Sequence, residues 1–70
     1  MAESFIALRT VVLTISDTRT LEDDRSGAYL EASLRECGHE VVTREIVPDE
    51  LHTIVARLRA HMAQRVDVIL

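Results

Sequence analysis

Residues 10–16 read TVVLTIS, a short run of apolar and β-branched residues that predicts the first strand. Its apolar residues do not alternate regularly with polar ones, which is typical of a parallel strand covered on both faces. Residues 40–47 carry Arg44 and Glu45 among apolar positions, and this mixed polarity favours a strand at the edge of a sheet. The run VDVIL at residues 66–70 is again densely apolar. The sequence therefore predicts three strands.

Two segments with helical spacing separate the predicted strands. The first extends from Ser26 to Cys37, where apolar residues recur at i, i+4 and i+7, and Gly38 follows at a position that often ends a helix. The second begins after Pro48, and its apolar stripe consists of Leu51, Ile54, Val55, Leu58 and Met62. The predicted element order is therefore strand, helix, strand, helix, strand.

This alternation implies parallel strands joined by right-handed crossovers, and hence an α/β fold with a doubly wound parallel sheet. Strand orders 3-2-1 and 2-1-3 are both compatible with it. The charged residues of the second strand favour order 2-1-3, which leaves that strand at the edge. The third strand then has one unpaired, apolar edge. We therefore expect this β-α-β-α-β portion to lack the remainder of its domain, and residues 1–7 to be a loose leader or an oligomer contact.

Composition and charge exclude several classes of function. With 47% apolar residues, two glycines and one proline, the 70 residues are typical of folded material and form at most one domain. The formal net charge of −4 argues against a grip on nucleic acid phosphates, so we expect no nucleic acid partner. Since nothing resembles a signal peptide and no apolar run has bilayer-spanning length, we expect a cytoplasmic protein with no membrane partner.

The cysteine and the histidines carry no predicted chemistry. Cys37 is expected to be a buried, inert thiol, because one cysteine forms neither an internal disulfide nor a thiolate cluster. His39, His52 and His61 lack the spacing of a metal site, so we expect them in solvent or at the rim of the sheet. No serine elbow is present, which leaves covalent catalysis without a candidate.

The carboxyl ends of the predicted parallel strands converge on one rim of the sheet, where Asp17 and Asp49 lie. With order 2-1-3, Asp17 borders the point at which open α/β sheets usually bind ligands. The loop after the first strand lacks glycine until Gly27, which disfavours a dinucleotide fingerprint or a P-loop. Asp24 or Ser26 either caps the following helix or helps its N-terminus to hold an anion. Asp49 likewise fits a helix N-cap or a Mg²⁺ ligand, and the two roles are compatible.

Four pieces of the sequence, in their order and spacing, resemble the N-terminal part of the molybdopterin-binding MoaB/Mog family, which includes a domain of gephyrin. They are VVLTISDTR at residues 11–19, EDDRSGAYL at 22–30, ECGHEVV at 36–42 and IVPDEL at 46–51. The combination is more specific than any single piece. Because the resemblance spans nearly the whole chain, residues 1–70 are identified as the N-terminal part of a single domain of this family.

The resemblance implies a role in molybdenum cofactor biosynthesis. Family members are expected to be trimeric or hexameric, to bind molybdopterin and, where active, to adenylate it with ATP and Mg²⁺. Asp49 matches a family catalytic aspartate, for which the resemblance implies the placement of magnesium and phosphate. The residues that the resemblance places in the loop shaping the pterin-phosphate pocket are Ser16, Asp17, Asp24, Ser26 and Gly27.

The family continues beyond the third strand into a T-G-G-T-G loop and a second essential aspartate, which these 70 residues do not contain. The 70 residues alone are therefore expected neither to bind molybdopterin appreciably nor to adenylate it. One alternative is a non-catalytic fragment or family member that acts only in oligomer assembly or partner binding. Another is a truncated receiver domain, but receivers carry adjacent acids after the first strand, whereas Asp17 is followed by Thr18 and Arg19.

Overall fold

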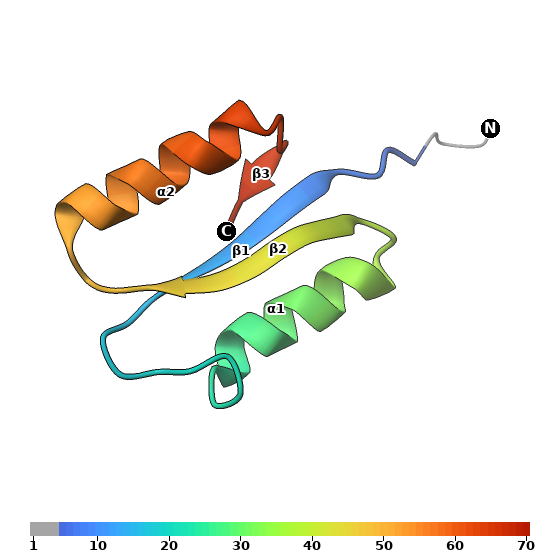
Figure 1. Ribbon diagram of the computed structural model, residues 1–70. Helices are drawn as coiled ribbons and strands as arrows, with labels where there is room; N and C mark the ends of the chain where they lie inside the picture. Colours follow the sequence, from blue (N-terminus) through green and yellow to red (C-terminus); the bar gives the residue numbers. More distant parts are fainter. Residues whose placement is uncertain (1–4) are drawn as a thin grey trace.

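The computed structural model describes residues 5–70 and shows the predicted alternation of strands and helices (Figure 1). In chain order the elements are β1 (Arg9–Ile15), α1 (Arg25–Glu36), β2 (Glu40–Val47), α2 (Leu51–Ala63) and β3 (Val68–Ile69). Residues 1–4 lie outside the described part, so the predicted leader at residues 1–7 is described only from Phe5 onward. Among residues 5–70, neither helix has the length and apolar character needed to cross a membrane.

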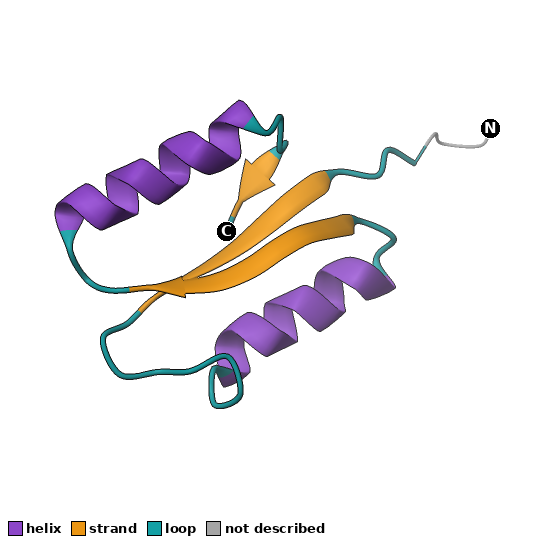
Figure 2. Ribbon diagram, viewed as in Figure 1, coloured by secondary structure: helices purple, strands orange, loops and turns teal. Residues whose placement is uncertain are grey.

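The three strands form one parallel sheet in the order β2-β1-β3, which confirms the predicted strand order and the α/β class. The two helices lie on opposite faces of this sheet, as in doubly wound folds (Figure 2). β1 is the central strand, and it pairs with β2 along its whole length, from Arg9 opposite Glu40 to Ile15 opposite Val47. The strand of mixed polarity therefore lies at the edge, as its charged residues indicated.

The small core is centred on β1. Val11 and Val12 are almost completely buried, and because successive strand residues point to opposite faces, they contribute to the two sides of the sheet. Val41 and Val47 extend the core along β2. Thr10 is also buried, and its hydroxyl donates a hydrogen bond of 2.7 Å to the carbonyl oxygen of Glu40. This bond satisfies a polar group that would otherwise be costly to bury.

β3 is shorter than the sequence predicted. The prediction extended over residues 66–70, whereas the regular strand covers only Val68–Ile69. Arg65, just after α2, has a left-handed conformation with φ 59°, so the chain is still turning toward β1 where the strand was expected to start. Pairing begins with the N–H of Asp67, which donates to the carbonyl oxygen of Arg9 at 2.7 Å.

α2 presents a different face to the sheet from the predicted one. The predicted apolar stripe included Met62, which is 68% exposed, whereas the neighbouring His61 is only 2% exposed. The expectation that His61 lies in solvent or at the rim is therefore wrong. The physical reason is Glu45 of β2, whose carboxylate contacts the His61 ring and also forms an ion pair with Arg57, one helical turn earlier.

α1 ends as its sequence predicted, at a glycine in the left-handed conformation. Gly38 has φ 88°, and the N–H groups of Gly38 and His39 donate to the carbonyl oxygens of Arg35 and Leu34, which forms a Schellman motif. Cys37 lies at the C-cap within a run of exposed residues. The expectation that its thiol is buried is therefore wrong, because the helix end projects into solvent.

The described part of the N-terminal segment lies against the turn that follows α1. The rings of Phe5 and His39 are tilted with their centroids 5.3 Å apart. The backbone N–H of Leu8 donates to Nδ1 of His39 at 3.0 Å, so this ring nitrogen acts as an acceptor. These contacts attach the segment preceding β1 to the start of β2.

Candidate functional site

The structure brings together the two predicted rim residues, Asp17 and Asp49. Asp17 follows β1 and Asp49 follows β2, and the backbone N–H of Asp49 donates to Oδ1 of Asp17 at 3.0 Å. One residue earlier, the N–H of Ser16 donates to the carbonyl oxygen of Val47 at 2.9 Å, which extends the parallel pairing beyond the strands. The loops that leave β1 and β2 are therefore fixed to each other at the carboxyl rim of the sheet.

Ser16 uses its side chain to shape the first of these loops. Its hydroxyl oxygen accepts the backbone N–H groups of Thr18 at 3.2 Å and Arg19 at 3.1 Å. A serine that binds the backbone two and three residues ahead turns the chain locally. The loop therefore leaves β1 with a defined direction, although it contains no glycine before α1.

Asp49 does not cap α2, contrary to one of its two predicted roles. The N-cap is Glu50, whose carboxylate accepts the N–H groups of His52 at 3.0 Å and Thr53 at 2.8 Å, together with the Thr53 hydroxyl. These hydrogen bonds, led by the one from the His52 backbone, lower the pKa of Glu50. Glu50 caps α2 in place of Asp49 because the longer glutamate side chain folds back over the first turn. Within residues 5–70 the exposed carboxylate of Asp49 has no recorded hydrogen bond or ion pair.

Asp24 is a buried cap. Its side chain is 1% exposed, Oδ2 accepts the hydroxyl of Thr14 at 2.6 Å, and Oδ1 accepts the N–H of Gly27 at 3.2 Å and, at 3.5 Å, the Ser26 hydroxyl. The hydrogen bond from Thr14 is the main reason that the pKa of Asp24 is lowered, and it outweighs burial, which acts in the opposite direction. Of the two predicted capping residues, Asp24 is the one that caps α1.

Gly27 is a glycine because it packs against that carboxylate. A Cβ built on Gly27 would lie 2.1 Å from Oδ2 of Asp24 and 3.0 Å from Oγ1 of Thr14. Real Cβ atoms essentially never come within 3.0 Å of another heavy atom, so the contact with Oδ2 of Asp24 is the one that excludes a side chain here. The buried cap therefore requires a residue without a side chain at this position.

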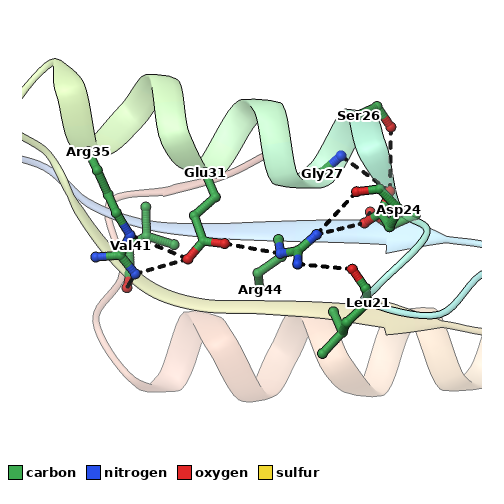
Figure 3. A network of polar contacts seen from close by, with 9 residues as sticks. Leu21, Asp24, Ser26, Gly27, Glu31, Arg35, Val41 and Arg44 are labelled. Atoms are coloured by element: carbon green, nitrogen blue, oxygen red, sulfur yellow. Dashed lines mark hydrogen bonds and ion pairs between the residues drawn. The ribbon is translucent and has the colours of Figure 1, made fainter.

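Arg44 of β2 supplies the positive charge for this corner of the fold (Figure 3). Its guanidinium lies 3.5 Å from Oδ2 of Asp24 and 3.1 Å from Oε1 of Glu31, and Glu31 in turn pairs with Arg35 at 3.0 Å. It also donates to the backbone carbonyl oxygens of Leu21 at 3.1 Å and Asp24 at 3.2 Å. Sequence reasoning used Arg44 only as a sign of an edge strand. A half-buried arginine in the middle of a strand was the available signal that an acidic partner faces it.

A second charged cluster lies on the opposite face of β2. Nε of Arg57 is 2.9 Å from Oε1 of Glu45, and Nε2 of His61 is 2.5 Å from the same oxygen. Burial raises the pKa of Glu45, but the hydrogen bonds from Arg57 and His61 outweigh it, so that the pKa is lowered overall. Nδ1 of His61 is buried without a hydrogen-bond partner in the described part of the chain. This cluster attaches α2 to the sheet and lies apart from the rim.

The donor set for a metal ion is small. The described residues contain no group of three or more histidine, cysteine, aspartate or glutamate side chains that could hold one. Mg²⁺, however, is usually bound by one or two carboxylates together with substrate phosphates and water. The free carboxylate of Asp49 fits that pattern. Oδ1 of Asp17 accepts the backbone N–H of Asp49, and within residues 5–70 Oδ2 of Asp17 accepts no hydrogen bond.

Residues 11–70 match the family model described as "Probable molybdopterin binding domain". The molybdenum cofactor biosynthesis protein B of Bacillus cereus is 45% identical over 64 residues, which cover 90% of this chain and 38% of that protein. The protein of the same name from Escherichia coli K12 is 41% identical over 63 residues, covering 90% and 37%. A crystal structure of a molybdenum cofactor biosynthesis protein B superposes with a TM-score of 0.82 at 41% identity, over 96% of this chain and 42% of that one. The chain thus spans less than half of the length of these relatives.

Proposed function

This chain belongs to the family of probable molybdopterin-binding domains, and from that membership we propose that the full-length protein acts in molybdenum cofactor biosynthesis. In this proposal the protein binds molybdopterin and adenylates it with ATP and Mg²⁺. The names of the similar proteins support the pathway. The arrangement of acidic groups at the rim supports the chemistry.

The observation that carries the proposal is the hydrogen bond of 3.0 Å from the N–H of Asp49 to Asp17. It fixes the backbone of Asp49 at the end of β2 while its carboxylate stays exposed and, among residues 5–70, free of recorded partners. Glu50 supports this arrangement, because it takes over the capping of α2. A carboxylate that is attached to a fixed backbone and is not neutralised by the described residues suits a group that binds a cation next to phosphates.

The residues at the rim have different roles in this proposal. Asp49 holds Mg²⁺, which when bound supplies positive charge to the phosphates of the nucleotide. Asp17 fixes the backbone of Asp49 at the rim. The remaining loop residues shape the pocket indirectly, because their polar groups are turned toward the chain itself; they are Ser16, Asp24, Ser26 and Gly27.

The proposal is tested with the full-length protein by following the formation of adenylated molybdopterin from molybdopterin and ATP, with and without Mg²⁺. We expect Asp49→Asn to lower the rate at least about 100-fold, as is usual when a group that stabilises transferring phosphates is removed. Glu36→Gln removes an exposed carboxylate at the end of α1 far from the rim, and it should leave the rate unchanged. Full activity of Asp49→Asn would contradict the proposed role of this residue.

The non-catalytic alternative gives a different result in the same assay. If the wild-type protein binds molybdopterin but forms no adenylated product, its function is binding and not catalysis. A wild-type protein that does neither would overturn the proposed function altogether. The 70 residues by themselves should neither bind molybdopterin appreciably nor adenylate it.

We further propose that the full-length protein is a homo-oligomer, either a trimer or a hexamer. The resemblance to the family carries this proposal, and several large apolar side chains of the described residues are exposed, which the remainder of the domain or a second copy of the protein would cover. They include Phe5, Ile6, Tyr29, Leu51 and Met62. Multi-angle light scattering of the full-length protein measures the mass of the assembly directly, and a monomer would contradict this part of the proposal.

A further inference from the structure

The guanidinium of Arg44 reaches from β2 to the loop that connects β1 with α1 (Figure 3). Nη2 donates to the carbonyl oxygen of Leu21 at 3.1 Å, and Nη1 donates to that of Asp24 at 3.2 Å. We propose that Arg44 is a positioning residue, which fixes residues 16–24, here called the β1–α1 loop, and thereby sets the shape of the ligand pocket. This inference rests on the function proposed above for the site, although its first test does not.

The contacts of the loop show why it depends on Arg44. Most of its other hydrogen bonds are local: Arg19 donates to the carbonyl oxygen of Asp23, and Asp23 accepts the N–H of Thr20 at 2.8 Å. Within the described chain, the single hydrogen bond that the sheet makes to residues 18–23 is the one from Arg44 to Leu21. The rim bond between Asp17 and Asp49 holds the beginning of the loop, and the hydrogen bond of 2.6 Å from Thr14 of β1 holds Asp24 at its end. Arg44 is the residue of the sheet that holds the segment between these two points.

The burial and charge of Arg44 explain why an arginine is needed. Its side chain is 15% exposed, and it meets the carboxylates of Asp24 and Glu31 in addition to the two carbonyl oxygens. A guanidinium presents five N–H donors in a fixed plane, so it serves all of these acceptors at once. A lysine keeps the charge but is a compact point donor on a flexible stem. Arg44→Lys therefore preserves the positive charge that pairs with the carboxylates, but it loses the simultaneous hydrogen bonds to the carbonyl oxygens of Leu21 and Asp24.

A purely structural role for Arg44 makes different predictions from a positioning role. The structural role requires only that losing Arg44 lowers the stability of the whole fold. The matched control is Arg57→Gln, which removes an arginine–carboxylate contact between β2 and a helix on the opposite face, where it touches no part of the β1–α1 loop. A variant that acts through the loop must affect the loop more than the control does at equal overall stability.

The first test is amide hydrogen exchange of the full-length protein without ligand. The amides of Thr20, Asp23 and Asp24 are hydrogen bonded within the loop, so they report on its order. We expect Arg44→Lys to speed their exchange at least tenfold, with no change in β1, whereas Arg57→Gln leaves the loop as in the wild type. Loop exchange that is unchanged in Arg44→Lys would overturn the inference. If that variant does not fold, Glu31→Gln, which removes one carboxylate partner of Arg44, should produce a smaller increase, and no increase would overturn it equally.

The second test is the dissociation constant for molybdopterin, measured for the same variants. Arg44→Lys should raise it at least tenfold and Arg57→Gln by less than threefold. Equal losses of affinity in both variants would show that Arg44 acts only through stability, which overturns the inference. A wild-type protein that binds no molybdopterin would defeat the proposed function instead, while the exchange experiment still decides whether Arg44 positions the loop.

Discussion

Replacing Gly27 with alanine sets two physical effects against each other. Alanine is a better helix former than glycine by about 1 kcal/mol, and Gly27 lies in the first turn of α1 with no positive φ that would require glycine. Propensity alone therefore predicts a more stable protein. Packing predicts the reverse, because the new methyl group would lie 2.1 Å from Oδ2 of Asp24 and 2.9 Å from its Cγ.

The packing effect should prevail, because the carboxylate cannot move without breaking its bonds. Thr14 donates to Asp24 at 2.6 Å, and a hydrogen bond to a charged group contributes about 1.5–3 kcal/mol. The N-cap bond to Gly27 contributes about 1 kcal/mol more. After subtraction of the gain in helix propensity, we expect Gly27→Ala to lower the free energy of unfolding by about 1.5–3 kcal/mol.

Urea denaturation of the full-length protein, followed by circular dichroism, measures this change. Ala28→Gly is the matched control, since it exchanges the same two residue types at an exposed neighbouring position and should cost only about 1 kcal/mol, from propensity. The substitutions at positions 27 and 28 are opposite in chemistry, yet both should destabilise. In an Asp24→Ala background, Gly27→Ala should become neutral or stabilising. A stabilising effect of Gly27→Ala in the wild type, or strict additivity with Asp24→Ala, would refute the packing argument.

Three further predictions concern the caps and the backbone. The pKa of Asp24 is lowered from 3.8, so its ionised form stabilises the fold above that pH. The loss of unfolding free energy caused by Asp24→Asn should therefore be constant from neutral pH to about pH 5 and shrink as the pH falls below 3.8. Denaturation at several pH values would show this. Glu50→Ala should lower the midpoint of urea denaturation by removing a cap that contributes about 1 kcal/mol, whereas Asp49→Ala should change stability by less than about 0.5 kcal/mol; the reverse order would contradict the assignment of Glu50 as the cap. Arg65→Gly should raise the melting temperature, because relief of the left-handed backbone, about 1–2 kcal/mol, exceeds the added entropy of the unfolded chain, about 0.4–1 kcal/mol.

The architecture was predictable because its signals are local and repeated. Helical spacing and apolar runs gave all five elements, and the charges of Arg44 and Glu45 were enough to place β2 at the edge of the sheet. The meeting of Asp17 and Asp49 was also predictable, because it follows from the parallel order of the strands. Gly38 and Asp24 ended and began α1 as their residue types suggested.

The errors arose where two similar residues competed for one position. Asp49 and Glu50 are adjacent acids, and only the reach of the longer side chain decides that Glu50 caps α2. His61 and Met62 are likewise neighbours, and the apolar pattern selected Met62 for the buried face. The outcome depended on a partner distant in sequence, Glu45, which no periodicity of the helix itself contains.

Arg44 and Glu45 show that the same charges that mark β2 as an edge strand also bind the two helical layers to it. Because they are successive residues, their side chains point to opposite faces of the sheet. Arg44 meets the acidic groups at the start of α1, and Glu45 meets the basic groups of α2. A strand with these two residues exchanged would keep its composition, net charge and edge-like pattern, yet it would place like charges opposite each other on both faces. Right-handed crossovers decide which helix covers which face. The order of the charges, which composition does not express, gives each face of β2 the charge that matches its helix, and it places Arg44 where it holds the β1–α1 loop beside the rim.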